Sequence, residues 1–181
     1  TDENTHNEVI LESRKIFLQC LKKQYWSLYN RHMLYKDVIV KLLDMVDDVL
    51  DTQELDWSDS IKPYCSTKNN LWMPFIGQCY GKCTKVYTVK HHYNIVSGYI
   101  IGQRETLTKL SDIIDNDELF EKLEEMSRKS EEMGLKFMKH LEETYPTLVS
   151  EIETNQVSYL ILKNQEDYLK QLSNDGEITE K

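Results

Sequence analysis

Three cysteines and two histidines near the middle of the chain are the residue types that could bind a zinc ion. Cys79 and Cys83 are separated by three residues, Cys65 precedes them, and His91 and His92 follow. Zinc sites usually pair cysteines at a two-residue separation, and Cys65 stands in a distant turn. We therefore expect buried or idle thiols and no cofactor, with a zinc site at Cys65, Cys79 and Cys83 as the weaker alternative.

Carboxylates are the other candidates for chemistry. The pairs Glu124–Glu125 and Glu131–Glu132 fall on an expected exposed helix face, where nothing would keep a carboxyl group protonated for acid–base work. A second group of carboxylates recurs at helical spacing: Asp44, Asp47, Asp48 and Asp51. The ligands of a calcium loop instead alternate along the chain. No glycine-rich phosphate loop or nucleophile elbow is present. The sequence predicts a protein that is not an enzyme.

The charge distribution restricts the partners. The net charge of −9 argues against nucleic acid, because binding phosphates needs clustered lysine and arginine. One window, residues 82–109, carries five basic residues and one acidic residue, a net charge of +4. Its members Lys82, Lys85, Lys90 and Arg104 form the candidate surface for anionic lipid or an acidic neighbour. The alternative is a solvated helix face.

The chain shows no sign of spanning a membrane or of secretion. No run of 18 apolar residues exists, and the cysteine spacing does not match a secreted disulfide framework, so a reducing cytosol fits better. The first residue is Thr1, and the last four residues resemble the start of another helix. We expect a segment of a longer protein.

Hydrophobic periodicity predicts an all-α fold. Apolar residues recur at steps of three and four in five stretches, with few glycines and prolines. The expected helices cover residues 7–29, 36–51, 86–115, 116–144 and 147–173. Together they form one extended helical array, with an ordered aromatic loop at residues 53–82. The single domain, residues 1–181, divides into a hairpin (7–51), an irregular connector (52–85) and three long helices (86–181).

Four residues are expected to matter for packing. Trp26 lies beside the apolar stripe of the first helix and Trp57 follows the second, so both are expected to be largely buried. Gly98 and Gly102 sit one turn apart inside a long helix, where each costs nearly 1 kcal/mol relative to alanine. We expect a close helix crossing there. Arg14 is placed at the edge of the first stripe.

Several motifs, in this order and spacing, resemble a known class of transporter. They begin with Leu21 to Trp26, Leu50–Asp51 and Leu55–Asp56–Trp57. They continue with Gly98 to Glu105, Glu143 to Pro146 and Glu166 to Gly176. This pattern resembles the segment after the membrane part in cation/proton exchangers of the plant salt-tolerance and sperm type.

The resemblance has two departures. His32 stands where the family usually has glycine, and Tyr35 replaces the serine that would cap the next helix. The resemblance does not extend to residues 58–85.

The resemblance implies a helical cytosolic domain that couples a sodium (cation)/proton antiporter core in the same chain to regulatory modules, within a homodimer. It would lie on the cytoplasmic side of a plasma, flagellar or ciliary membrane, and transport residues would lie outside it. The rival interpretations are a free-standing helical adaptor or scaffold and a metal-stabilised binding module.

Overall fold

The computed structural model describes residues 2–52, 56–65, 78–112, 114 and 116–175, with side chains from residue 8 in the first helix and from residue 86 in the third. These parts contain helices and no strand, which confirms the all-α prediction. In chain order the helices are α1 (Asp2–Asn30), α2 (Lys36–Asp51), the 3₁₀ helix η1 (Ser58–Tyr64), α3 (Gln78–Leu110), α4 (Asp117–Thr144) and α5 (Pro146–Asn174).

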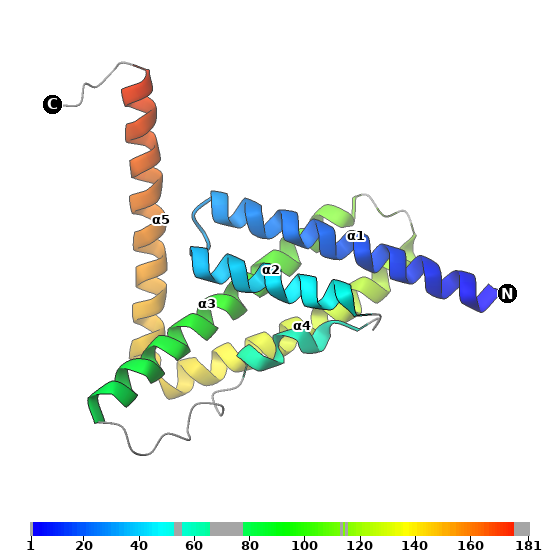
Figure 1. Ribbon diagram of the computed structural model, residues 1–181, viewed down its shortest axis with the longest axis horizontal. Coiled ribbons are helices and arrows are strands. Elements are labelled where there is room, and N and C mark those ends of the chain that lie inside the picture. The colour runs from blue at the N-terminus through cyan, green and yellow to red at the C-terminus, as the bar shows by residue number, and fades with distance from the viewer. Residues whose placement is uncertain (1, 53–55, 66–77, 113, 115, 176–181) are drawn as a thin grey trace.

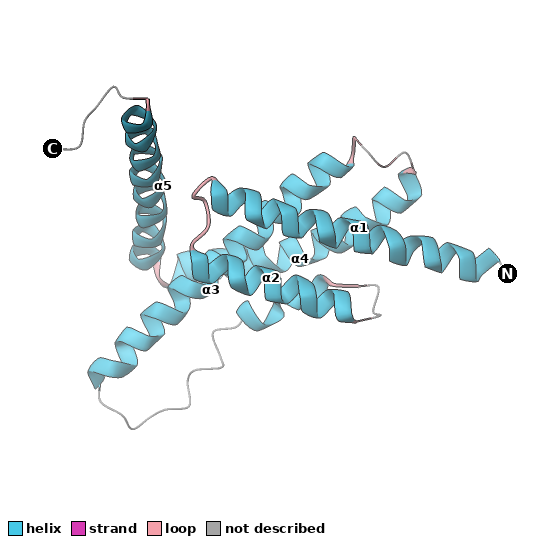
Figure 2. Cartoon of the chain, turned by 45° about the horizontal axis from the view of Figure 1, so that its top comes forward, coloured by secondary structure: helices cyan, strands magenta, loops and turns pink. Residues whose placement is uncertain are grey.

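The first four α-helices form a two-layered body, and α5 projects from it. Helices α1 and α2 make an antiparallel hairpin that lies across α3 and α4, and η1 lies against α4 (Figure 1). Helix α5 leaves the end of α4 and stands to one side of the hairpin. The same separation is visible after a 45° turn (Figure 2). The molecule is therefore a packed body with one helical arm.

The ends of the helices agree with the sequence at some points and differ at others. Helix α2 spans the residues predicted for it, but α3 begins at Gln78, eight residues before the predicted start, and ends at Leu110. The predicted connector 52–85 is therefore partly helical. Gly81 did not stop α3, because a glycine inside a helix costs only about 1 kcal/mol. The remainder of the aromatic loop, 53–55 and 66–77, lies outside the described residues.

The predicted start of α4 and the corner before α5 are confirmed. The Asn116 side chain caps α4 by accepting a hydrogen bond from the Leu119 amide at 3.2 Å. Tyr145 ends α4, and Pro146 occupies the first position of α5. A backbone N–H at that position has no partner within the helix, so proline loses no hydrogen bond there.

The turn between α1 and α2 shows the cost of both departures from the exchanger pattern. His32 has a φ of 59°, a left-handed conformation that glycine adopts without strain and that other residues adopt rarely. At Tyr35, the N-cap of α2, the structure shows no side-chain capping hydrogen bond. A glycine at position 32 would adopt this backbone conformation without strain, and a serine at position 35 could cap α2.

One core joins all the described helices. Its members are buried side chains that point inward from the hairpin, η1, α3, α4 and the first half of α5. They include Phe17, Leu18, Leu21, Tyr25, Leu28, Val38, Ile39, Leu42, Trp57, Ile61, Tyr93, Ile95, Val96, Tyr99, Ile100, Leu110, Leu123, Phe137, Leu141, Val149 and Ile152.

The two tryptophan predictions have opposite outcomes. Trp57 is 2% exposed and stacks on Phe17 with ring centroids 4.9 Å apart, so the prediction for it is confirmed. Trp26 is 49% exposed, so the prediction for it was wrong. Tyr25 takes the inward position, and the side chain of the next residue in a helix points about 100° further around the helix axis. Trp26 therefore points away from the core, and its ring meets that of Tyr29 edge-on.

Arg14 is buried, not at the edge of a stripe. Its guanidinium donates to the carbonyl oxygens of Val49 and Thr52, the latter at 3.3 Å. These carbonyls belong to the C-terminal end of α2, where backbone oxygens lack helical partners and attract a positive charge. Arg14 thus ties α1 to the end of α2.

Candidate functional site

The predicted close crossing lies at the centre of the body. A Cβ atom added to Gly98 would lie 2.7 Å from Leu34 Cδ2 and 3.2 Å from Leu42 Cδ1. One added to Gly102 would lie 2.8 Å from Tyr25 Cδ1 and closer still to Cε1. The close approach is thus confirmed. The atoms that approach are side chains of the hairpin rather than the backbone of another helix.

The three residues after Gly102 bind two different helices. Gln103 is fully buried and accepts a hydrogen bond from the Ser127 hydroxyl of α4 at 2.8 Å. Arg104 donates from Nε to Glu131 of α4, also at 2.8 Å. Glu105 accepts from Arg31, in the turn directly after α1, at 2.9 Å. We call residues 98–105 the α3 hub, because they meet α1, α2 and α4 within two turns.

A second network lies beside the hub on the α1 side. The Gln24 side chain donates to Glu105 and accepts from Lys109, so α1 and α3 are joined through two consecutive turns of α3. Gln24 is buried, and a buried hydrogen-bonded amide favours one register between the two helices. The hub is therefore held in position by specific polar bonds as well as by shape.

Small residues on α4 complete the packing around the hub, and sequence reasoning missed them. Ser127 and Ser130 are fully buried, and a Cβ atom on Gly134 would lie 3.0 Å from both Val96 and Ile100. The signal in the sequence was the spacing of small residues at three and four positions along a helix. That spacing lets α4 approach α3 closely.

A polar joint connects α5 to the body. Lys90 and Tyr93 of α3 contact Glu151 and Glu153 at 2.6 and 2.8 Å, and Gln156 donates to Asn94 at 2.7 Å. Burial, together with the hydrogen bond to Glu153, raises the pKa of the Tyr93 hydroxyl, so this group stays protonated as a donor. The Lys90–Glu151 ion pair is exposed and therefore holds the helices together only weakly, whereas the other two contacts are partly buried.

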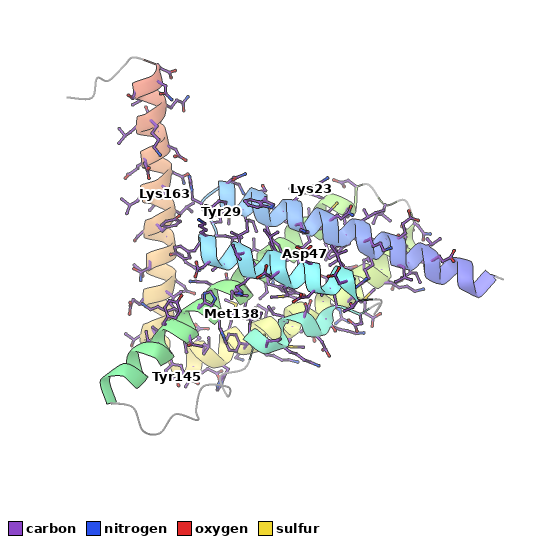
Figure 3. The ribbon with its side chains drawn as sticks, in the orientation of Figure 1. Lys23, Tyr29, Asp47, Met138, Tyr145 and Lys163 are labelled. Carbon is purple, nitrogen blue, oxygen red and sulfur yellow. The ribbon has the colours of Figure 1, made fainter. Side chains whose placement is uncertain are left out.

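Further along α5 the contacts pass to the hairpin turn. His32 Nε2 lies 2.6 Å from Asp167 Oδ2, and the rings of Tyr35 and Tyr159 are 4.8 Å apart. Figure 3 labels Lys163 on α5 and Tyr29 at the end of α1. A cavity of about 130 Å³ lies between the turn, α3 and α5. Its walls include Leu34, Val38, Gly98, Ile101 and Leu160.

Only one cysteine of the zinc alternative can be placed. Cys65 is half-buried at the end of η1, and burial raises the pKa of its thiol to about 11, which keeps it protonated at neutral pH. The side chains of Cys79 and Cys83 lie outside the described residues. In the described ranges no group of three or more histidine, cysteine or acidic side chains could hold a metal ion. His91 instead lies 3.1 Å from Asp37.

The basic window is partly neutralised within the chain. Lys90 pairs with Glu151, and Arg104 pairs with Glu131. The side chains of Lys82 and Lys85 lie outside the described residues. Two of the four predicted members therefore already pair with acidic residues of other helices, and the prediction of an anionic-lipid or acidic partner stays a prediction.

No described helix is long and apolar enough to cross a bilayer. In comparisons with known proteins, no family profile matches the chain and no similar curated protein was found.

Proposed function

We propose that this chain is a cytosolic coupling domain of a membrane sodium (cation)/proton antiporter. It would lie on the cytoplasmic side of a plasma, flagellar or ciliary membrane and link the transport core to regulatory modules within a homodimer. The observation that carries the proposal is the α3 hub. The exchanger-like motif Gly98 to Glu105 coincides with the segment that contacts α1, α2 and α4 at once.

The arrangement of the hub suits the transmission of a displacement. Helix α1 follows directly on the membrane part in the exchangers that the sequence resembles, so movement there would reach α3 through Tyr25, Gln24 and Arg31. The hub would pass it to α4 through Ser127 and Glu131, and α4 leads into α5. Such coupling requires two arrangements whose contacts differ in free energy, by roughly 1–3 kcal/mol in known cases.

Gly98 and Gly102 are the most direct places to test this mechanism. In the full-length exchanger, alanine at position 102 would push the Tyr25 ring and the hairpin away from α3, and alanine at position 98 would disturb the hairpin less; neither touches a transport residue. Overpacking typically costs about 1–3 kcal/mol, which changes a balanced two-state equilibrium by roughly five- to a hundred-fold. We expect a changed pH or signal threshold, with exchange itself retained.

The measurement is proton-coupled cation flux in vesicles or cells, at matched surface expression. Thr108→Leu is the control, because Thr108 lies on the exposed side of the same helix. Normal flux with normal regulation in both glycine variants would refute the coupling role and favour the adaptor. Loss of flux despite normal expression would show a role in assembly of the transporter and refute a purely modulatory role.

The adaptor alternative has one observation in its favour. The second half of α5 exposes large apolar side chains, among them Leu162 and Tyr168, which is typical of a surface that binds another helix. A free-standing adaptor would bind its partner through this face without any antiporter in the same chain. Intact regulation in the flux experiment would support this second reading.

A further inference from the structure

The second half of α5 carries an apolar face that is largely exposed, although its first member, Val157, also lines the cavity beside the hairpin turn. Its members are large side chains that are each more than half exposed: Val157, Ile161, Leu162, Tyr168 and Leu169. Single exposed apolar residues are normal on a protein surface, but a continuous set over four helical turns marks an interaction site. We call these residues, together with the half-buried Leu172, the α5 face.

Helical geometry places the α5 face in one sector. With about 100° between successive residues, its six members fall within a sector roughly 140° wide. Only Ser158 and Gln165 interrupt it, and both are uncharged. The charged residues of this stretch all lie outside the sector: Lys163, Glu166, Asp167 and Lys170.

The charged side of α5 already has partners. Asp167 binds His32 in the hairpin turn, and Glu166 binds both Lys163 and Lys170 at 2.6 Å. Hydrogen bonds and charge from these two lysines lower the pKa of Glu166 to about 2, so the network stays charged. The second half of α5 therefore sets its charged residues toward the body, together with Tyr159 and Leu160, and its most exposed apolar residues away from it.

We propose that the α5 face binds the same face of a second copy of this chain, with the two helices antiparallel. Four of its six residues are spaced symmetrically about a midpoint between Asn164 and Gln165, whereas Leu162 and Leu169 lie to one side of this symmetric set. A two-fold axis at that point sets Val157 opposite Leu172 and Ile161 opposite Tyr168. An interface between identical copies needs this self-complementarity, because each patch must meet itself.

Charge also favours a second copy over a lipid surface. The sector contains no charged side chain, so two copies meet there without repulsion between like charges. Helices that bind anionic membranes carry free basic residues beside their apolar face. Lys163 and Lys170 are instead paired with Glu166, and the whole chain has a net charge of −9.

The size of the face determines the strength to expect. Residues 157–172 span about 22 Å of helix, and a pair of such faces buries on the order of 1,000 Å². This is the lower end of specific interfaces, so the dimer should be reversible and concentration-dependent. The proposal rests on α5 alone and does not depend on the antiporter role.

Sedimentation velocity of the 181-residue chain tests the association. We expect a shift from monomer to dimer between about 1 and 100 μM, and an increase of at least about 100-fold in Kd for the double variant Ile161→Glu, Leu169→Glu. Leu135→Glu is the matched control, since Leu135 is an exposed leucine on α4, and it should dimerise like the unchanged chain. Circular dichroism must show that both variants keep their helices. A chain that is monomeric throughout, or a control that loses the dimer equally, overturns the proposal.

Cysteine cross-linking tests the antiparallel geometry. Gln165→Cys, beside the two-fold axis, should form an intermolecular disulfide, whereas Lys163→Cys on the opposite side should give no more than the unchanged chain with its native thiols. A mixture of Val157→Cys and Leu172→Cys should cross-link, and each alone should not. Cross-linking of each alone would show parallel helices and overturn the proposal. A chain that stays monomeric and floats with phosphatidylserine–phosphatidylcholine vesicles would also overturn the proposal.

Discussion

The α3 hub and the α5 face are both segments of long helices, yet they differ in which residues they bury. The hub buries glycines and a glutamine beside its apolar Tyr99 and Ile100, and its Gln103 is fully inaccessible to solvent. The α5 face exposes large apolar residues, such as Ile161 and Leu169. Hydrophobicity alone therefore does not decide burial in this chain. What decides it is whether another helix arrives at that face with a complementary shape.

The two segments also differ in what holds them. The hub lies in the continuous core, whereas the second half of α5 is joined to the body through exposed pairs such as His32–Asp167. Exposed ion pairs contribute little to stability, and segments held by them open locally at low cost. Substitutions in the body should therefore lower the free energy of unfolding, and substitutions on α5 should leave it almost unchanged.

The largest loss in the free energy of unfolding is expected when Trp57 is replaced by alanine. The ring is 2% exposed and stacked on Phe17, so its removal leaves a cavity and should cost about 3–5 kcal/mol in chemical denaturation. Trp26→Ala serves as the matched control and should cost less than about 1 kcal/mol, because that ring is half exposed. Equal losses in the two variants would contradict the packing described here.

Gly102→Ala should have the next largest effect. Its new methyl group would collide with the buried Tyr25 ring, and overpacking of this kind costs about 1–3 kcal/mol. Gly98→Ala should cost less, since the nearest atom is the end of the Leu34 side chain, which can rotate away. Urea titration of both variants measures the difference. A more stable Gly102→Ala protein would show that the hub is looser than the structure indicates.

A smaller effect is expected on the pH dependence of stability, through His92. Burial, and then the neighbouring His91, lower the pKa of His92 in the folded chain. The unfolded chain then takes up the proton more readily, so the stability present above about pH 6.5 is lost as the pH falls. The melting temperature should drop less between about pH 7.5 and 5.5 in His92→Gln than in the unchanged chain. An equal drop in both would exclude His92 as the cause.

The smallest effect is expected on the arm. Leu162→Ser, on the α5 face, should change the free energy of unfolding by no more than about 0.5 kcal/mol, when measured at a concentration at which the chain is monomeric. Amide hydrogen exchange of the same sample should be faster in residues 157–172 than in the α3 hub. A loss of several kcal/mol would show that this face is buried against the body, which would remove the contrast between the two regions.

Much of the helical framework could be predicted from periodicity and from end signals. The Asn116 cap and the Tyr145–Pro146 corner are local, since each depends on atoms within a few residues. The start of α3 was missed because no residue there forbids a helix, so the boundary depended on weak preferences. The α3 hub could be predicted only in part. Two glycines one turn apart indicated a close neighbour, but not which one.

The sequence by itself determined the helices, the stripe on each and the need for space at Gly98 and Gly102. Only the tertiary structure decided which stripe is covered: Trp26 faces outward, Arg14 lies buried against the end of α2, and the second half of α5 turns its most exposed apolar residues away from the body. The physical reason is that backbone periodicity sets the angle of a side chain around its own helix. Whether another surface meets it depends on packing between segments far apart in the chain, which no local pattern specifies.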